Sequence, residues 1–390
     1  MNKNSTHKLK DLDLMKVRVN NIIISRLKEL YKIWGYDEVS PQYIDNLETL
    51  KAGGAINIEE ISKLVSDDPI GLRPEMTSII VRNTCGISKN KLKPLKLFTN
   101  GTVFKRRINE EGHLIIEEKL QSGIEIIATE KTNIEIEALT ILMESIGKLK
   151  IDKFYNIKLL LNSTELMELI LRGFDVNYRK QIREYLVKIN QVDLSELKIS
   201  EDDKIKLLEI LYTRGEPIKV LKKLENFLGK NKTLEALKDK FNILSPIAKS
   251  FNLDIQLDPT FQPHFNLYAG IVFNLICDEE DKHTIIAKGG RYDELIDHFN
   301  KDNKSFAGIG FTFSIDNIRE LLMKKEKFIK IEKTLVAFGP NKNINVALDQ
   351  QRILHKKNII TVLELNQCNT KDDALSIASN RGCINLHWIN

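Results

Sequence analysis

The stretch from Leu97 to Ala128 constrains the fold more than any other part of this chain. It contains two long runs rich in β-branched and aromatic residues, residues 96–107 and 114–127, a composition typical of strands. The loop between them, residues 108–113, carries charged residues and one glycine. Two such runs around a polar loop predict a long β-hairpin. The fold therefore needs a sheet that includes this hairpin.

The second run of the hairpin carries Gln121 and Glu125, with Gly123 between them. Side chains two and four residues apart lie on the same face of a strand, and a glycine would leave room above the backbone there. An amide oxygen and a carboxylate in fixed positions suit the ammonium group and ring N–H of a small polar ligand. The alternative is the solvated face of an amphipathic strand, and this segment alone favours that alternative.

The composition limits the class of protein. The chain has 390 residues, of which 42% are hydrophobic, enough for a full core and two or three domains. Its 59 basic and 54 acidic residues leave a net charge of only +5, and no dense basic segment with interleaved aromatic residues indicates nucleic-acid binding. The polar N-terminus and the lack of a run of about 18 apolar residues predict a soluble, cytoplasmic protein.

The four cysteines, Cys85, Cys277, Cys368 and Cys383, lie far apart in the sequence. None belongs to a C-x-x-C pair, which argues against a structural zinc site or a disulfide framework. We therefore expect buried free thiols and no metal site.

The segment before the hairpin predicts a long helix over residues 11–34, followed by a short strand that leads to Pro41. At residues 71–77 the chain turns into a helix that extends to about residue 84. We expect Pro74 in the first turn of that helix and Glu75 near its positive N-terminus. Taken in isolation, Glu75 is an ordinary acidic residue at a helix start.

Two glycine-containing segments follow the hairpin. Strand patterns at residues 268–277 and 284–287 come first, and the second runs into Gly289-Gly290. Ala307 to Phe311 has a similar glycine pattern. Glycines let a backbone approach a ligand or a neighbouring strand closely, although a Gly-Gly turn is an equally good interpretation.

The pattern of elements divides the chain into a core and a C-terminal unit. Residues 1–325 form the core, and their charged, helical stretch at about 163–250 is expected as an inserted helical subdomain. Residues 326–333 are the expected linker. Residues 334–390 alternate strand and helix, which predicts a small α/β unit with a parallel sheet.

Seven short motifs occur in a specific order between residues 10 and 325. They are GY at 35–36 before SP at 40–41, LRPEMT at 72–77, VFKRR at 103–107, QSGIE at 121–125, YAGIVF at 268–273, GGRYD at 289–293 and GIGF at 308–311. This order resembles the catalytic core of histidyl-tRNA synthetase and, more closely, its paralogue, the regulatory subunit of ATP phosphoribosyltransferase. The resemblance implies an α+β class II synthetase fold, an antiparallel sheet flanked by helices, that dimerises around Pro41.

The resemblance also implies a histidine site. Its residues would be Glu75, Thr77, Gln121, Glu125, Tyr268, Arg291 and Tyr292. Glu75, Gln121 and Glu125 supply the acceptors that a histidine ammonium and imidazole require, because burying a cation without partners is costly. The context of the motifs thus reverses the preference for a solvated strand. No cofactor is expected.

Three departures from the synthetase pattern separate the two relatives. Lys105 stands where the synthetase has its motif-2 arginine, Pro263-His264 where it has an Arg-Gly pair, and Asn317 where it has its motif-3 arginine. Guanidinium groups hold and polarise ATP phosphates better than a mobile ammonium does. Arg106, Arg107 or Arg319 could substitute for them in principle. The C-terminal unit is also short for an anticodon-binding domain, so no tRNA binding is expected.

The resemblance therefore implies a regulatory chain without catalytic activity of its own. Such a chain would assemble with a short-form catalytic subunit of ATP phosphoribosyltransferase into a hetero-octamer, support the first step of histidine biosynthesis and take part in feedback inhibition by histidine. One alternative is a histidyl-tRNA synthetase-like enzyme that activates histidine with ATP. Another is a class II-like ligase for a different amino acid.

Overall fold

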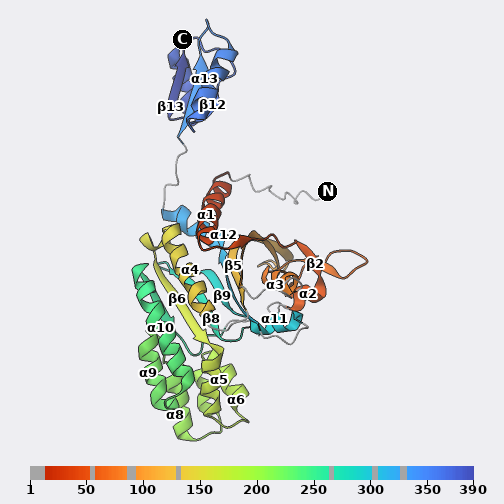
Figure 1. The fold of residues 1–390 in the computed structure, drawn as a ribbon, viewed down its shortest axis with the longest axis vertical. Coiled ribbons are helices and arrows are strands. Elements are labelled where there is room, and N and C mark those ends of the chain that lie inside the picture. Colours follow the sequence, from red (N-terminus) through yellow and green to blue (C-terminus); the bar gives the residue numbers. More distant parts are fainter. Residues whose placement is uncertain are drawn as a thin grey trace. The chain divides into compact units, whose positions relative to one another are not determined.

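The computed structural model describes residues 14–52, 58–85, 94–128, 133–262, 268–300, 306–325 and 332–390. The chain divides into two compact units, Met1–Lys325 and Glu326–Asn390 (Figure 1). The large unit contains the hairpin and every candidate site residue.

One eight-stranded sheet organises the large unit. Its strands are β1 (Asp37–Glu38), β4 (Leu95–Ile108), β5 (Leu114–Ala128), β6 (Asn156–Ser163), β7 (Leu253–Leu257), β8 (Ile271–Asp278), β9 (His283–Arg291) and β10 (Ala307–Ser314). The order across the sheet is β1-β4-β5-β10-β9-β8-β6-β7. The pairs β1/β4 and β6/β7 are parallel, and all other neighbours are antiparallel.

The predicted hairpin consists of β4 and β5, which have 14 and 15 residues. Its register places Leu97 opposite Glu125 and Gly101 opposite Gln121. Because successive side chains alternate between the faces of a sheet, Gln121 and Glu125 do share one face. We call this side of the sheet the site face and the opposite side the far face.

Three helices cover the far face: α1 (Leu14–Ile33), α4 (Ile134–Leu149) and α12 (Ile315–Lys325). The buried residues of α1 recur at three- and four-residue spacing, as in an amphipathic helix; they are Val19, Ile23, Leu27, Leu30 and Tyr31. The Tyr31 ring packs against Phe98 of β4 and Phe311 of β10, with ring centroids 5.5 and 6.4 Å apart. The main core of the unit therefore lies between these helices and the far face.

Two shorter helices, α3 (Thr77–Cys85) and α11 (Asp293–Phe299), lie on the site face and contact one another. Val81 of α3 and Leu295 of α11 belong to a buried cluster with Ile127 of β5. Because α3 begins at Thr77, the prediction that Pro74 lies in its first turn is wrong. Pro74 lies three residues before the helix. Glu75 lies near the N-terminus of α3, where it was expected.

Short elements connect α1 to α3. They are β2 (Ile44–Asn46), α2 (Leu47–Ala52), the 3-10 turn η1 (Ile58–Glu60) and β3 (Ile70–Leu72). β2 and β3 pair with each other in a small antiparallel sheet.

The inserted segment joins two parallel neighbours, β6 and β7, which cannot be linked by a tight turn. It forms helices α5 (Thr164–Arg172), α6 (Arg179–Val187), α7 (Gln191–Glu196), α8 (Glu201–Leu211), α9 (Pro217–Leu228) and α10 (Lys232–Ser250). Figure 1 shows these helices gathered at one end of the large unit. The insertion contacts the rest of the unit through α10, which packs against α4 and β7, and through α9 and α5, which contact β7 and β6.

The C-terminal unit is a three-stranded parallel sheet with two helices. Its elements are β11 (Lys333–Phe338), α13 (Ile344–Lys356), β12 (Ile360–Leu363), α14 (Lys371–Asn380) and β13 (Asn385–Ile389). The strand order is β12-β11-β13, with both pairs parallel. The parallel sheet predicted from the alternation of strand and helix is thus present.

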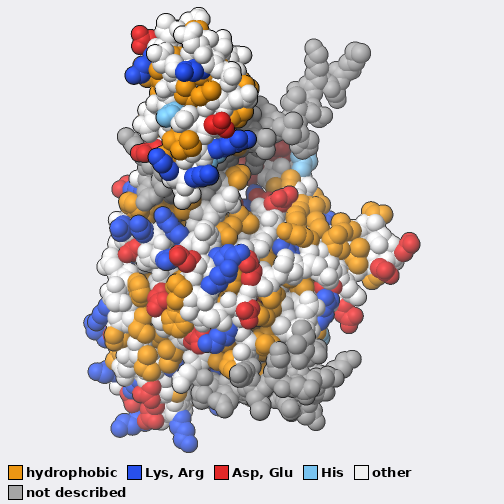
Figure 2. All heavy atoms as spheres, turned by 45° about the horizontal axis from the view of Figure 1, so that its top comes forward, with side chains coloured by type: hydrophobic (Ala, Val, Ile, Leu, Met, Phe, Trp, Pro, Cys, Tyr) orange, Lys and Arg blue, Asp and Glu red, His pale blue; other side chains and the backbone are white. Residues whose placement is uncertain are grey.

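Three of the four cysteines, Cys277, Cys368 and Cys383, are buried free thiols, as predicted. The side chain of Cys85 lies outside the described residues. On the face drawn in Figure 2, acidic and basic side chains of the large unit are interspersed. Among the helices that the structure describes, none has the length and apolar character needed to cross a bilayer.

Candidate functional site

Glu125 is the centre of the candidate site. Its side chain extends from β5 on the site face and is buried, with 4% of its surface exposed. The Thr77 hydroxyl donates a hydrogen bond to Glu125 Oε1 over 2.6 Å, and the Tyr292 hydroxyl donates one to Oε2 over 2.5 Å. Helix α3 and the end of β9 therefore hold the carboxylate from both sides. The solvated-strand interpretation of Glu125 is wrong.

Glu75 lies at the N-terminus of α3, where its carboxylate accepts hydrogen bonds from the backbone N–H and the hydroxyl of Ser78. It thus caps the helix, as the simpler interpretation of this residue expected. Burial raises the pKa of Glu75 to about 7, against the opposing effect of its hydrogen bonds and of Arg73. Capping and a role in the site are compatible, because the capped carboxylate remains close to Glu125.

Burial likewise raises the pKa of Glu125 to about 7, opposed by the hydrogen bonds from Thr77 and Tyr292 and reinforced by the negative charge of Glu75. Two carboxyls that repel each other out of water favour a bound cation, since it would compensate both charges. The arrangement can therefore bind an ammonium group, and binding would shift both carboxyls toward the ionised form.

Glycines on the neighbouring strands make room for these side chains. A Cβ on Gly310 would lie 1.9 Å from Glu125 Oε2, and one on Gly308 would lie 2.4 Å from the Tyr292 ring. A Cβ on Gly290 would lie 2.5 Å from the Tyr268 ring. No larger residue fits at these positions without displacing a candidate site residue.

The structure bears on two expectations about glycines. Gly123 permits the close approach of β5 and β10, because a Cβ there would lie 2.2 Å from the backbone oxygen of Phe311. Room for a ligand above Gly123 stays a prediction. Gly289 and Gly290 do not form a turn, because both lie within β9.

Gln121 and Tyr268 complete the group on the site face. Gln121 is half-buried and lies four residues before Glu125 on β5, opposite Ser314 of β10. The Tyr268 ring covers Gly290. Burial and the negative charges of Glu125 and Glu75 raise the pKa of Tyr268.

The structure does not bring Arg291 to this group. Arg291 is paired in the sheet with Ile309, one position away from Gly290, so its side chain extends to the far face. There its guanidinium forms ion pairs with Glu135 of α4 at 3.2 Å and with Asp293 at 2.9 Å. Arg291 therefore anchors the end of β9 that carries Tyr292.

Sequence reasoning overlooked Arg73, which has only 2% of its surface exposed. Its Nε donates to the backbone oxygen of Thr102 over 2.8 Å, its Nη1 donates to the backbone oxygen of Pro41, and its guanidinium stacks on the Tyr43 ring at 4.2 Å. Arg73 thus connects the LRPEMT segment to β4 and to the Pro41 segment. Its place in that motif, two residues before Glu75, was the available signal.

Asn317, one of the departures from the synthetase pattern, and the arginines suggested as replacements bond to other groups. The Asn317 side chain donates to the backbone oxygen of Ile285 over 2.8 Å. Arg319 bonds to Asn20 of α1 and Asp316 on the far face, and Arg107 pairs with Glu117 near the hairpin tip.

Arg106 lies next to Lys105 on β4, so its side chain extends to the face opposite that of Lys105. Pro263-His264 lies outside the described residues. In the part of the chain that the structure describes, none of the suggested replacements supplies a guanidinium next to Glu125. No cluster of three potential metal ligands occurs there either.

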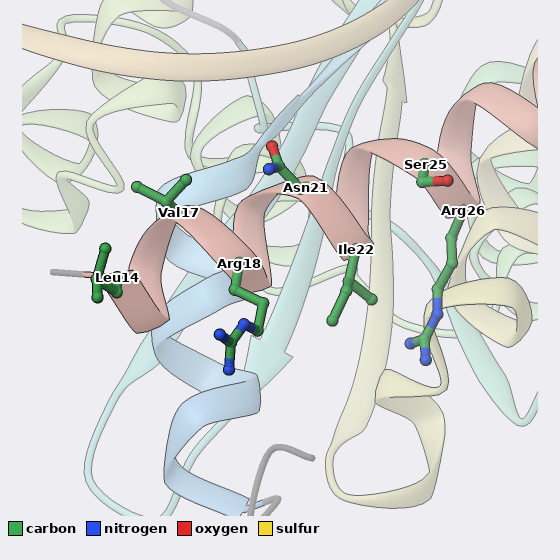
Figure 3. A pocket seen from close by; sticks show the side chains of 7 residues that line it. All are labelled: Leu14, Val17, Arg18, Asn21, Ile22, Ser25 and Arg26. Atoms are coloured by element: carbon green, nitrogen blue, oxygen red, sulfur yellow. The ribbon is translucent and has the colours of Figure 1, made fainter. Parts of the chain in front are cut away.

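A separate hollow follows one face of α1 (Figure 3). Its lining residues repeat at three- and four-residue intervals and all come from this helix: Leu14, Val17, Arg18, Asn21, Ile22, Ser25 and Arg26. Figure 3 shows Arg18, Ile22 and Arg26 extending to the same side of the helix. This surface is distinct from the group around Glu125.

Comparison with known proteins identifies the family. The family model of histidyl-tRNA synthetase matches residues 8–318. The ATP phosphoribosyltransferase regulatory subunit of Prochlorococcus marinus is 43% identical over the whole of both chains. The chain belongs to the family of ATP phosphoribosyltransferase regulatory subunits. A member named in the same way from Synechococcus is 39% identical, covering 98% of this chain and 97% of the relative.

Solved structures show that the fold is that of class II synthetases, as predicted. A chain described as an ATP phosphoribosyltransferase regulatory subunit/histidyl-tRNA synthetase from Bacillus halodurans matches with a TM-score of 0.79 and 20% identity, over 96% of this chain and 94% of that one. Histidyl-tRNA synthetase from Nostoc matches with a TM-score of 0.75 and 16% identity, over 94% and 86%. Because the two matches cover 96% and 94% of this chain, both include residues of its C-terminal unit as well as its core.

Proposed function

We propose that this member of the regulatory-subunit family is the non-catalytic regulatory subunit of ATP phosphoribosyltransferase. It supports the first step of histidine biosynthesis, is needed for the activity of a short-form catalytic subunit, and takes part in histidine feedback inhibition. The names of relatives that match along the full chain support this function. A cytoplasmic location is part of the proposal, since the reaction belongs to small-molecule biosynthesis.

The observation that carries the proposal is the contrast between two halves of a synthetase site. The carboxylate of Glu125, which can accept from an ammonium group, is buried on the site face, and two hydroxyls donate to it over 2.5 and 2.6 Å. The positions that a synthetase uses to grip ATP phosphates carry Lys105 and Asn317. A site that keeps amino-acid recognition without phosphate-gripping arginines fits a sensor of histidine better than a ligase.

We propose that histidine binds on the site face. Glu75, Glu125 and Thr77 would hold the ammonium group and Gln121 would accept from the imidazole, with the rings of Tyr268 and Tyr292 closing the site. Arg291, the remaining residue of the predicted set, would act from the far face by holding the strand end that carries Tyr292. These assignments rest on the buried carboxylate of Glu125, on the half-buried side chains of Glu75 and Gln121, and on the glycines that make room for Glu125 and the two tyrosine rings.

Feedback inhibition requires that histidine favour one of two arrangements of the assembly. A ligand shifts such an equilibrium only toward the arrangement that it binds more tightly. The coupling is therefore reciprocal: the less active arrangement must have the higher affinity for histidine. Helix α3 is a suitable element to transmit the change, since Glu75 caps its N-terminus and Thr77 bonds to Glu125.

The proposed partner is the short-form catalytic subunit, in a hetero-octamer, and two copies of this chain would pair through the class II core. The hollow along α1 supports a pairing surface there, because Leu14 and Val17, which line it, are 73% and 57% exposed. Tyr43 and Ile44, which follow the Pro41 segment, are 52% and 44% exposed. Binding of tRNA is not part of the proposal.

The second candidate, an enzyme that activates histidine with ATP, is tested by pyrophosphate exchange. We expect no exchange above background when the purified chain is given histidine, ATP and labelled pyrophosphate. An authentic histidyl-tRNA synthetase, assayed in parallel, serves as the positive control. Histidine-dependent exchange that is lost in a Glu125→Gln variant would refute the non-catalytic function, because contamination would not respond to that change.

A further inference from the structure

A bound amino acid carries a carboxylate as well as an ammonium group, and that carboxylate needs a positive partner when it leaves water. The arginines nearest the proposed histidine site are already engaged. Arg291 pairs with Glu135 and Asp293 on the far face. Arg73 donates to backbone oxygens and is 2% exposed. The counter-charge must come from elsewhere on the site face.

The sheet register points to Lys288 of β9. Gly290 of this strand is aligned with Gly310 of β10, which is aligned with Glu125 of β5. Lys288 lies two residues before Gly290 and therefore extends from the same face, one side-chain row away. That row is displaced by roughly 7 Å along the strand, a distance that the flexible four-carbon stem of a lysine can span.

The surroundings of Lys288 are polar and positive. Its cross-strand neighbours are Thr312 of β10 and Asn274 of β8, both half-buried. Within the described ranges, no carboxylate forms an ion pair with Lys288. The side chain of Lys288 is exposed and therefore open to a ligand. Partial desolvation and the positive charge of Lys105 both lower the pKa of Lys288. An anion placed here would relieve the repulsion between the two ammonium groups.

We propose that Lys288 forms an anion subsite that binds the α-carboxylate of the amino acid whose ammonium group is held by Glu75 and Glu125. The inference rests on the proposed histidine site and assigns a partner to the half of the ligand that the carboxylates cannot bind. It predicts that the site selects zwitterionic amino acids over amines of the same shape.

The test compares two ligands by calorimetry: L-histidine and histidinol, which has an alcohol in place of the carboxylate. A hydrogen bond to a charged group supports a preference of the wild-type protein for L-histidine of about 10- to 100-fold. In Lys288→Met, L-histidine should lose most of that preference, while histidinol should bind as in the wild type. Lys288→Arg, which keeps a cation, should retain the preference.

Lys119→Met is the matched control. Lys119 lies on the same face of the hairpin but already pairs with Glu117 at 3.3 Å, so its replacement should leave both affinities unchanged. Thermal melting of each variant shows whether the fold is intact.

The outcomes separate the two proposals. If the wild type binds both ligands equally, or if Lys288→Met weakens both alike in a folded protein, the anion subsite is refuted while the histidine site stands. If the wild type binds neither ligand, the histidine site itself is refuted, and the subsite with it.

Discussion

Replacing Glu125 with Gln removes the negative charge at the centre of the site and preserves the shape of the side chain. Glu125 is 4% exposed, so a ligand ammonium paired with it would lie out of water. Removing one partner of a buried, hydrogen-bonded charge pair costs about 2–5 kcal/mol, or roughly a 30- to 4,000-fold increase in Kd. We therefore expect Glu125→Gln to weaken L-histidine binding by at least about 30-fold at pH 8.

The pKa of Glu125, about 7, gives this prediction a second signature. The ammonium group binds the ionised carboxylate, which is nearly fully formed at pH 8 and reduced to about one tenth at pH 6. Wild-type affinity should thus fall about tenfold over this window because of Glu125 alone. The Gln variant lacks this titration, so the ratio of wild-type to variant affinity should shrink by about tenfold between pH 8 and pH 6.

Isothermal titration calorimetry at pH 6, 7 and 8 measures both quantities. The imidazole of free histidine also titrates in this range, but it does so identically for the two proteins and cancels in the ratio. Glu118→Gln is the control, because Glu118 lies on the same strand and is exposed. A Glu125→Gln variant with wild-type affinity, or an affinity ratio that does not change with pH, would show that Glu125 is not the ionised acceptor.

Two further predictions concern the residues that support the site. Gly310→Ala would place a Cβ 1.9 Å from Glu125 Oε2; overpacking of this kind costs about 1–3 kcal/mol, so we expect a lower Tm and at least tenfold weaker histidine binding. Gly173→Ala lies outside the site, and its Cβ would be 3.3 Å from the backbone oxygen of Ile170. It should leave histidine binding unchanged, and equally weakened binding in the two variants would contradict the close-packing argument. Arg73→Lys should lose the fork of hydrogen bonds to Thr102 and Pro41 and destabilise the protein by about 1–3 kcal/mol in denaturant unfolding. A variant as stable as the wild type would show that this guanidinium does not hold the Pro41 segment.

The hairpin could be predicted from the sequence because its signals are local. Alternating strand residues on both sides of a short polar loop specify β4 and β5 with errors of at most one residue at their ends. The same holds for the parallel sheet of the C-terminal unit. The start of α3 was less predictable, because proline is tolerated in a first helical turn. Pro74 nevertheless precedes the helix. The backbone of the preceding residue, Arg73, is engaged outside the helix: its carbonyl oxygen accepts a hydrogen bond from the Phe104 N–H.

The face to which a side chain extends depends on register, which a single sequence does not reveal. Glu125 and Gln121 could be placed together because they lie on one strand. Arg291 and Tyr292 are adjacent in sequence, and the structure separates them: Tyr292 reaches Glu125, whereas Arg291 reaches Glu135 on the far face. Lys288 escaped notice for the same reason, since only the pairing of β9 with β10 and β5 shows that it shares the face of Glu125.

Burial was the other quantity that local sequence could not supply. An acidic residue in an alternating strand is most often solvated, and on local grounds that was the better interpretation of Glu125. Its burial depends on α3 and α11, which are distant in sequence and pack together over Val81 and Leu295. The order of the seven motifs carried this information because it implied the whole fold rather than one strand.

We propose that this chain activates a catalytic partner and responds to histidine. Reconstitution tests it most directly: phosphoribosyl transfer to ATP is measured with the short-form catalytic subunit alone, with this chain added, and with both plus histidine. We predict low activity for the catalytic subunit alone, a large increase when this chain is added, and a decrease with histidine that Glu125→Gln reduces. Activity that is the same with and without this chain would contradict the account.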